Sequence, residues 1–157
     1  MANLWFHRSF RAFTLIELLI AISILGILAA GVLVAVNPVK RQNQAKDAQI
    51  KADTGQIATA AQSYFSSGSG IGSYPADLET LVTNQDLKNL PTPPTSAAYE
   101  YVVTAWGGGV CDATIANPCT YARLSEPLQA PAASGNVWCW QSSTGQAQEL
   151  TIALCTP

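Results

Sequence analysis

The sequence is poor in histidine and in charged residues. Its single histidine is His7, and Lys, Arg, Asp and Glu together make up only 11% of the 157 residues, against about a quarter in an average protein. If the leader that contains His7 is removed, no imidazole is left for Ser-His-Asp or Cys-His catalysis or for a histidine-ligated metal. A net charge of -2 argues against a general nucleic-acid binder. The low charge also excludes a disordered acidic or basic tail.

What the sequence does have is one long apolar run. From Leu18 to Val36, 16 of 19 residues are Ala, Val, Ile or Leu. About 20 such residues span the hydrocarbon core of a bilayer. A helix that is apolar on every side is rarely needed in a soluble domain. We therefore predict a single membrane-spanning helix.

The residues before the run admit two interpretations. Residues 1–12 carry Arg8 and Arg11 and suit the basic region of a secretory signal peptide, with cleavage near Gly31. The apolar run is, however, longer than the usual 7–15 residues of such a signal, and Glu17 lies near its start. An ionisable group in a membrane segment is by default a functional hypothesis whose partner should be named. A cut before Phe13 would create an α-amine one helical turn from Glu17, and this amine on another chain is the partner we expect.

Arg11-Ala12 followed by Phe-Thr-Leu-Ile-Glu-Leu-Leu-Ile resembles the N-terminal signature of type IV pilins and type II secretion pseudopilins. The resemblance implies a class III leader over residues 1–12, cut by a prepilin peptidase between Ala12 and Phe13, and methylation of the Phe13 amine. It also implies that Glu17 neutralises the N-terminal amine of a neighbouring subunit during assembly. The family usually has glycine before the cut, so Ala12 predicts slower processing.

The helix is expected to continue beyond the membrane. Pro38 should kink or end it, but an apolar face resumes at Ile50, Ile57, Ala61, Tyr64 and Phe65. The opposite, polar face is predicted to carry Lys46, Gln49, Asp53, Gln56 and Gln62. A long helix over residues 13–65, with residues 13–36 in the membrane, fits the α+β pilin fold, in which the second half packs on an antiparallel sheet.

Residues 66–157 are predicted to form the globular head. Four segments have the composition of strands and predict a sheet of three or four strands, the last two as a hairpin: Tyr99–Trp106, Cys119–Leu124, Val137–Gln141 and Glu149–Cys155. The proline-rich residues 90–95 are interpreted as a rigid spacer within the head rather than a ligand for a partner domain. Trp138 and Trp140 share one strand face, and a place in the core or a subunit interface is favoured over a surface stacking platform.

The four cysteines, Cys111, Cys119, Cys139 and Cys155, form no C-x-x-C pair, so zinc is not expected. In a head outside the cytoplasm they predict two disulfides, with three possible connectivities that sequence cannot decide. We favour Cys111–Cys119, and also Cys139–Cys155, which resembles the C-terminal disulfide loop of type IV pilins. The loop oxygens of Asp112, Thr114 and Asn117 resemble a pseudopilin calcium loop, but they include only one carboxylate, whereas calcium takes six to eight oxygens. We predict no metal and no cofactor.

The sequence therefore predicts a structural filament subunit and not an enzyme. The resemblance implies four partners: copies of the same chain, prepilin peptidase, an inner-membrane assembly platform, and membrane lipid before assembly. The subunit would cross the cytoplasmic membrane once with its head outside and then enter a pilus or pseudopilus. From Ala48 onward the chain has 3 basic and 8 acidic residues, so no nucleic acid is expected. A secreted binding domain behind an ordinary signal peptide, a DNA-uptake pilin and an anchored enzyme remain the alternatives.

Overall fold

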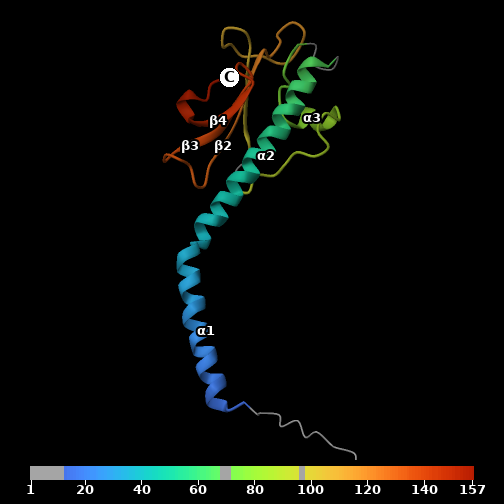
Figure 1. Ribbon diagram of the computed structural model, residues 1–157. Helices are drawn as coiled ribbons and strands as arrows, with labels where there is room; N and C mark the ends of the chain where they lie inside the picture. The colour runs from blue at the N-terminus through green and yellow to red at the C-terminus, as the bar shows by residue number, and fades with distance from the viewer. Residues whose placement is uncertain (1–12, 68–71, 96–97) are drawn as a thin grey trace, which may run out of the picture. The chain divides into compact units, whose positions relative to one another are not determined.

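The computed structural model describes residues 13–67, 72–95 and 98–157. The chain divides into two compact units, with the boundary after Val39. The first contains helix α1 (Leu15–Val36), and the second contains nearly all of helix α2 (Pro38–Ser66) together with the head (Figure 1). The two units are described separately.

Helix α1 begins with a capping box. Thr14 is the N-cap residue, and its hydroxyl accepts a hydrogen bond from the Glu17 amide while the Glu17 carboxylate accepts one from the Thr14 amide. This reciprocal pair satisfies two amides that have no partner within the helix. The helix ends at Asn37, whose φ of 44° is left-handed, and Pro38 then opens α2. Proline is tolerated there because the first turn needs no amide donor.

The single helix predicted over residues 13–65 is therefore two helices. It starts two residues later than predicted, is interrupted at Asn37 and runs to Ser66. The prediction that Pro38 kinks or ends the first segment is confirmed. The left-handed backbone of Asn37 interrupts the helical hydrogen bonding between α1 and α2. Asparagine adopts that conformation more readily than most residues.

Helix α2 buries one face against the head. Ile50, Ile57, Ala61 and Tyr64 are buried as predicted, and Phe65 packs against the same core. The prediction for Asp53 is wrong: this carboxylate is 9% exposed and accepts a hydrogen bond of 2.7 Å from the Tyr99 hydroxyl. The buried face of α2 is thus wider than the apolar pattern alone indicates, and it also includes Asp47 and Thr54.

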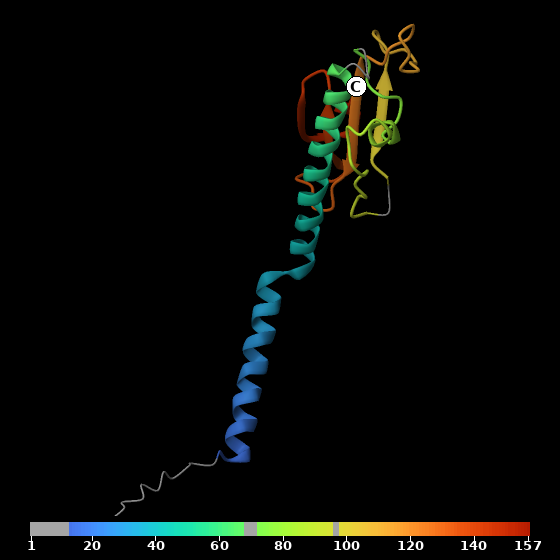
Figure 2. The ribbon, with the colours of Figure 1, turned by 90° about the vertical axis from the view of Figure 1, so that its right-hand side faces the viewer.

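The head contains a four-stranded antiparallel sheet in the order β1-β2-β3-β4. The strands are β1 (Glu100–Thr104), β2 (Tyr121–Pro127), β3 (Asn136–Gln141) and β4 (Gln146–Thr151). Each strand pairs with the next along the chain, and α2 lies beside the sheet in both views (Figures 1 and 2). The short helix α3 (Glu79–Thr83) and the 3-10 turn η1 (Ile152–Leu154) complete the elements. The fold is α+β and consistent with the pilin fold.

The last strand differs most from its prediction. The sequence predicts a strand over Glu149–Cys155, but β4 starts at Gln146 and ends at Thr151, and η1 follows. The first half of β4 contains two glutamines, Gln146 and Gln148, that pair with β3. Because both are polar, a strand prediction based on apolar residues does not include them. The apolar residues Ile152 and Leu154 lie in the turn instead, just before Cys155, which is bonded back to Cys139 in β3.

The two sheet faces have different cores. Leu124, Ala122 and Trp140 join the α2 face of the sheet to Ile57, Ala61 and Tyr64 of the helix in the main core. On the outer face, Val137, Cys139 and Cys155 form a second small cluster with Leu150 packed against it. The second cluster exists because the chain end folds back over the outer face.

Candidate functional site

Helix α1 is the first candidate, because none of its residues is buried by residues 13–67, 72–95 or 98–157. Its large side chains are exposed by 50% or more, and Phe13 just before it is 84% exposed. The one polar residue within the run, Ser23, donates its hydroxyl to the Ile20 carbonyl at 2.8 Å, so it presents no unpaired group. Such a surface requires lipid or protein to cover it.

Glu17 is the only charged residue of α1. Its Oε2 atom accepts hydrogen bonds from the Thr14 amide at 3.0 Å and from the Thr14 hydroxyl at 2.8 Å. All of the Glu17 carboxylate hydrogen bonds among the described residues use Oε2. The carboxylate is therefore turned toward the start of the helix, where Phe13 lies.

The expected cleavage site is only partly visible. Ala12 lies outside the described residues, whereas Phe13 is described and exposed. Further along α1, a Cβ added at Gly26 or Gly31 would meet no atom within 4 Å. Together with Ala29 and Ala30, these glycines form a small-residue segment where another helix could approach closely.

Among the described residues, one helix is long enough and apolar enough to cross a membrane, judged by length and composition, and this helix is α1. It lies near the N-terminus, where a signal sequence would meet the same criteria. The helix fits a single-pass membrane anchor.

The cysteines are joined in the two pairs favoured from the sequence. Cys111 bonds to Cys119 within the β1–β2 connection, and Cys139 of β3 bonds to Cys155 after η1. Three of these four residues, all except Cys111, are buried. The first bond closes a surface loop, and the second holds the chain end against the sheet.

The oxygens considered for calcium are engaged with one another. Asp112 Oδ1 accepts from the hydroxyl of Thr114 at 2.7 Å and from its amide at 3.1 Å. These hydrogen bonds, the side-chain one first, lower the pKa of Asp112. Asn117 in turn donates its side-chain amide to the Val110 carbonyl at 3.3 Å. Among the described residues no three His, Cys, Asp or Glu side chains are grouped in a way that could hold a metal ion.

Trp138 and Trp140 both face α2. Trp140 is 3% exposed and packs edge-on against Tyr74, with ring centroids 6.2 Å apart. Trp138 is half-buried, and the Lys51 ammonium lies 4.7 Å from the centroid of its ring. A cation over an aromatic face is a favourable contact. The pair therefore belongs to the helix–sheet packing and does not form a surface platform.

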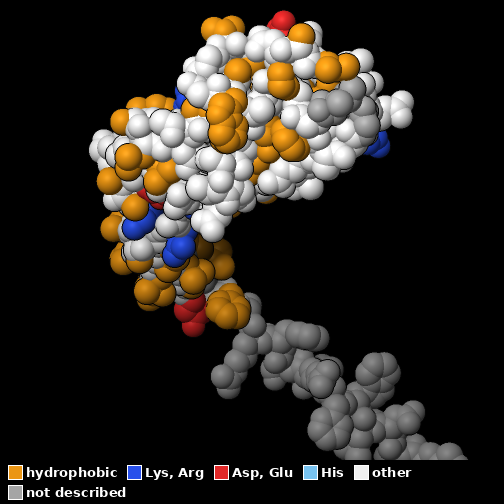
Figure 3. Space-filling view, turned by 90° about the horizontal axis from the view of Figure 1, so that it is seen from above, with side chains coloured by type: hydrophobic (Ala, Val, Ile, Leu, Met, Phe, Trp, Pro, Cys, Tyr) orange, Lys and Arg blue, Asp and Glu red, His pale blue; other side chains and the backbone are white. Residues whose placement is uncertain are grey.

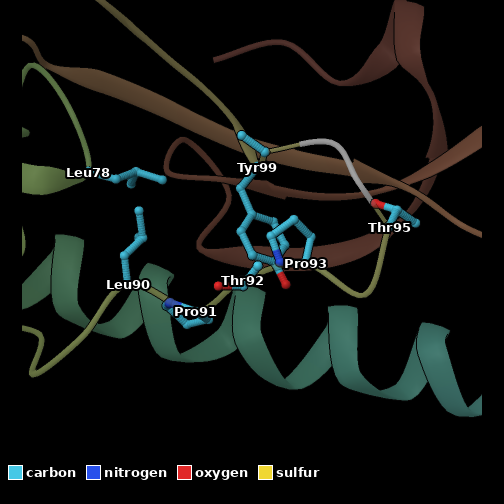
Figure 4. A pocket seen from close by; sticks show the side chains of 8 residues that line it. Leu78, Leu90, Pro91, Thr92, Pro93, Thr95 and Tyr99 are labelled. Atoms are coloured by element: carbon cyan, nitrogen blue, oxygen red, sulfur yellow. The ribbon is translucent and has the colours of Figure 1, made fainter.

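The proline-rich residues 90–95, except Pro94, line a cavity of about 360 Å³ together with Leu78, Ala98 and Tyr99 (Figure 4). The segment is held to α2 and to the sheet, because Gln49 donates to the Thr92 carbonyl and the Thr95 hydroxyl donates to Glu126. The interpretation as a spacer within the head is consistent with these contacts.

Two carboxylates with structural roles, Asp47 and Glu126, are not indicated by any pattern in the sequence. Buried Asp47 accepts the amides of Gln129 at 2.6 Å and Ala130 at 2.9 Å. Glu126 is 1% exposed, and its Oε2 has no hydrogen-bond partner within the described part of the chain. Burial raises the pKa of Glu126, and the hydrogen bond from Thr95 opposes that rise. Their contacts are too distant in sequence for a local pattern to indicate them.

Thr14 was also missed as a site residue. The sequence does contain a pattern that indicates its role, because Thr14-x-x-Glu17 before an apolar run has the form of a capping box.

A model of the prokaryotic N-terminal methylation motif matches residues 7–33. This match covers the expected cut, Glu17 and most of α1, and it is consistent with a type IV pilin-like protein. Families of this kind are structural rather than catalytic. No curated protein and no solved structure matches the chain significantly.

Proposed function

We propose that this chain is a structural subunit of a type IV pilus-like or type II secretion pseudopilus filament. A prepilin peptidase removes residues 1–12, methylates the amine of Phe13 and releases a subunit anchored by α1. The subunit waits in the cytoplasmic membrane with its head outside, and an assembly platform then extracts it into the filament. A DNA-uptake filament is a variant of the same proposal.

The observation that carries this proposal is the overlap of the methylation motif with a helix that its own chain leaves uncovered. The motif spans residues 7–33, and all 22 residues of α1 are exposed. Lipid covers such a helix before assembly. In a filament, helices of neighbouring copies would replace that lipid, and Gly26, Ala29, Ala30 and Gly31 would allow them to approach closely.

Glu17 sets the register of assembly in this proposal. Its Oε2 is held by Thr14, so Oε1 can accept the charged amine of Phe13 from a neighbouring copy. A carboxylate without a partner in an apolar bundle is costly, so slipped arrangements that leave it unpaired are disfavoured. The charge therefore favours one axial offset between helices.

The first test is intact-mass spectrometry of the fraction sheared from cells that make the protein. The expected species starts at methylated Phe13 and has both disulfides closed. The same species retained with the cells would indicate a short envelope pseudopilus. A terminus near Gly31 would refute the proposal and indicate a secreted domain behind an ordinary signal peptide.

The second test separates the charge of Glu17 from its cap. Glu17→Gln keeps a side chain that can complete a capping box but removes the charge, whereas Glu17→Val removes both. Both variants should insert and be processed normally, and both should lose most of the sheared filament. Normal filament yield from Glu17→Gln would refute the amine pairing.

The cleavage position has its own test. Ala12→Gly should speed processing, and Ala12→Trp should block it, which electrophoresis of pulse-labelled protein would show. Mature-length product from Ala12→Trp would place the cut elsewhere.

A further inference from the structure

The beginning of helix α2 carries a group of positive charges shortly after the apolar helix α1. Lys40, Arg41 and Lys46, together named the basic segment, are three of the six Lys and Arg residues that follow residue 12. All three residues are exposed. Lys40 interacts with its own chain, whereas neither Arg41 nor Lys46 forms an ion pair within the described part of the chain. Positive charge is therefore available at this position.

No exposed carboxylate lies near the basic segment in the sequence. The acidic residue before it is Glu17, and the one directly after it is Asp47. The Asp47 residue is 6% exposed, and its carboxylate accepts the amides of Gln129 and Ala130 at 2.6 and 2.9 Å. The face of the head in view in Figure 3 shows few charged side chains, in contrast to the basic segment. The positive charge of the segment is thus not offset by an exposed neighbour along the chain.

The stability of α2 does not account for these positive charges. The helix dipole places partial positive charge at the first turn of a helix and favours acidic side chains there. The first turn of α2 contains no acidic residue, and the third and fourth residues of the helix are Lys40 and Arg41. Cations at these positions of α2 are locally unfavourable, which points to an anionic partner outside the chain.

The basic segment follows α1 at the distance where lipid headgroups begin. Helix α1 has 22 residues and is about 33 Å long at 1.5 Å per residue, which matches a hydrocarbon core of about 30 Å. Lys40 and Arg41 follow Val36 by four and five residues, or about 6–8 Å at the same rise. The headgroup layer on each side of the core is about 5–8 Å thick. Lys46 lies beyond this layer but within about one Debye length of it.

We propose that Lys40, Arg41 and Lys46 bind the phosphate groups of anionic phospholipids where α1 leaves the membrane. The inference rests on the proposed function, which places α1 in the bilayer with the head outside. An arginine guanidinium can donate two hydrogen bonds to one phosphate, and a lysine ammonium attracts it as a point charge. This binding holds the head end of α1 at the headgroups of the outer leaflet and fixes the depth of the subunit before extraction.

Removal of the leader makes this contact the main charged anchor of the subunit. Arg8 and Arg11 lie in residues 1–12 and leave with the leader in the proposed function. The charged groups that remain at the inner end of α1 are the Phe13 amine and Glu17, whose charges cancel. The basic segment at the outer end then carries the net charge beside the membrane. Nucleic acid fits this segment less well than lipid, because the head beyond residue 47 has 3 basic and 8 acidic residues and repels it.

Native mass spectrometry of the protein purified from cells in detergent measures this lipid preference. The protein is mixed with equal amounts of phosphatidylglycerol and phosphatidylcholine that have the same acyl chains. The unaltered protein should retain about ten times more phosphatidylglycerol than phosphatidylcholine. Arg41→Gln should lower this ratio about fivefold, which is the contribution of one cation near an anionic lipid surface. Replacing Lys40, Arg41 and Lys46 together by glutamine should bring the ratio close to one.

Two control variants distinguish the basic segment from positive charge elsewhere. Lys88→Gln removes one exposed cation from the head and should leave the ratio unchanged. Lys40→Arg combined with Lys46→Arg keeps all three charges and should keep the ratio. Equal retention of both lipids by the unaltered protein, or equal losses in Arg41→Gln and Lys88→Gln, would overturn the proposal. Displacement of phosphatidylglycerol by a short DNA oligonucleotide at equal concentration would also overturn it and assign the segment to nucleic acid.

The outcomes separate the two proposals. If the unaltered protein is processed at Phe13 and forms filaments but retains both lipids equally, only the lipid contact is wrong. If the lipid preference depends on Arg41 but the protein is neither processed at Phe13 nor assembled, the proposed function is wrong and the lipid contact is retained. An intact mass with both disulfides closed and an unchanged tryptophan emission spectrum confirm that each variant has a folded head.

Discussion

Helices α1 and α2 adjoin in sequence and differ in what covers them. Helix α1 has 22 residues, none of which is buried, whereas α2 has 29 residues, of which nine are buried by the head. The head covers one face of α2, whereas the described part of the chain buries no residue of α1. A helix that is apolar on every side and exposed on every side needs lipid or another protein chain to cover it. An amphipathic helix needs only its own domain to cover its apolar face.

The largest difference between the helices should appear when the same side chain is truncated in each. Ile57→Ala in α2 removes a residue that is 1% exposed and should lower the free energy of unfolding of the head by about 2–5 kcal/mol. Ile24→Ala in α1, where the residue is 53% exposed, should leave it unchanged. Urea denaturation in detergent, followed by tryptophan fluorescence, measures both, because the tryptophans after residue 12 all lie in the head. Equal destabilisation by the two variants would show that α1 packs on the head.

The disulfides should affect only the head. Replacing Cys139 and Cys155 together by serine removes a bond across 16 residues and should cost about 3 kcal/mol. Replacing Cys111 and Cys119, which are 8 residues apart, should cost about 2.5 kcal/mol because the closed loop is shorter. The same denaturation experiment ranks the pairs, and membrane insertion through α1 should be unchanged in both. Loss of insertion would mean that the two regions do not fold independently.

Asp47 and Lys46 allow a sharper comparison within α2. Asp47→Asn weakens the acceptor of two backbone amides, those of Gln129 and Ala130, and should cost about 1–3 kcal/mol. The adjacent exposed Lys46→Gln should change stability by less than about 0.5 kcal/mol. Thermal unfolding of the two variants tests this. A neutral Asp47→Asn would show that these amides find other acceptors.

The smallest effect is expected at Glu126 and depends on pH. Because burial raises the folded-state pKa of this carboxyl, its favourable contribution is complete below the unfolded pKa and is lost as pH rises through the folded value. Glu126→Gln removes that loss, so the variant should have a higher Tm than the parent at pH 8, with the gap closing toward pH 4. Melting curves across this range measure it. A gap that grows on acidification would mean that the ionised form is the stabilised one.

Four carboxylates show which structural roles a sequence pattern can indicate and which it cannot. Glu17 could be assigned a role because its partners are local: Thr14 is three residues away, and the apolar run is contiguous. Asp53 was assigned to the wrong face because its partner, Tyr99, is 46 residues away. Asp47 and Glu126 gave no signal for the same reason.

The sequence by itself determined the apolar helix α1, the break before Pro38, the apolar residues on the buried face of α2 and the presence of a small sheet. These features follow from local periodicity, from proline geometry and from the length of an apolar run, which act over a few residues. The tertiary structure decided which polar side chains the head buries, the end of β4 at Thr151 and the cluster of Val137, Cys139 and Cys155 on the outer face of the sheet. These features depend on strand order and on contacts between distant residues. Burial is a property of what surrounds a side chain, and the chain must fold before that is defined.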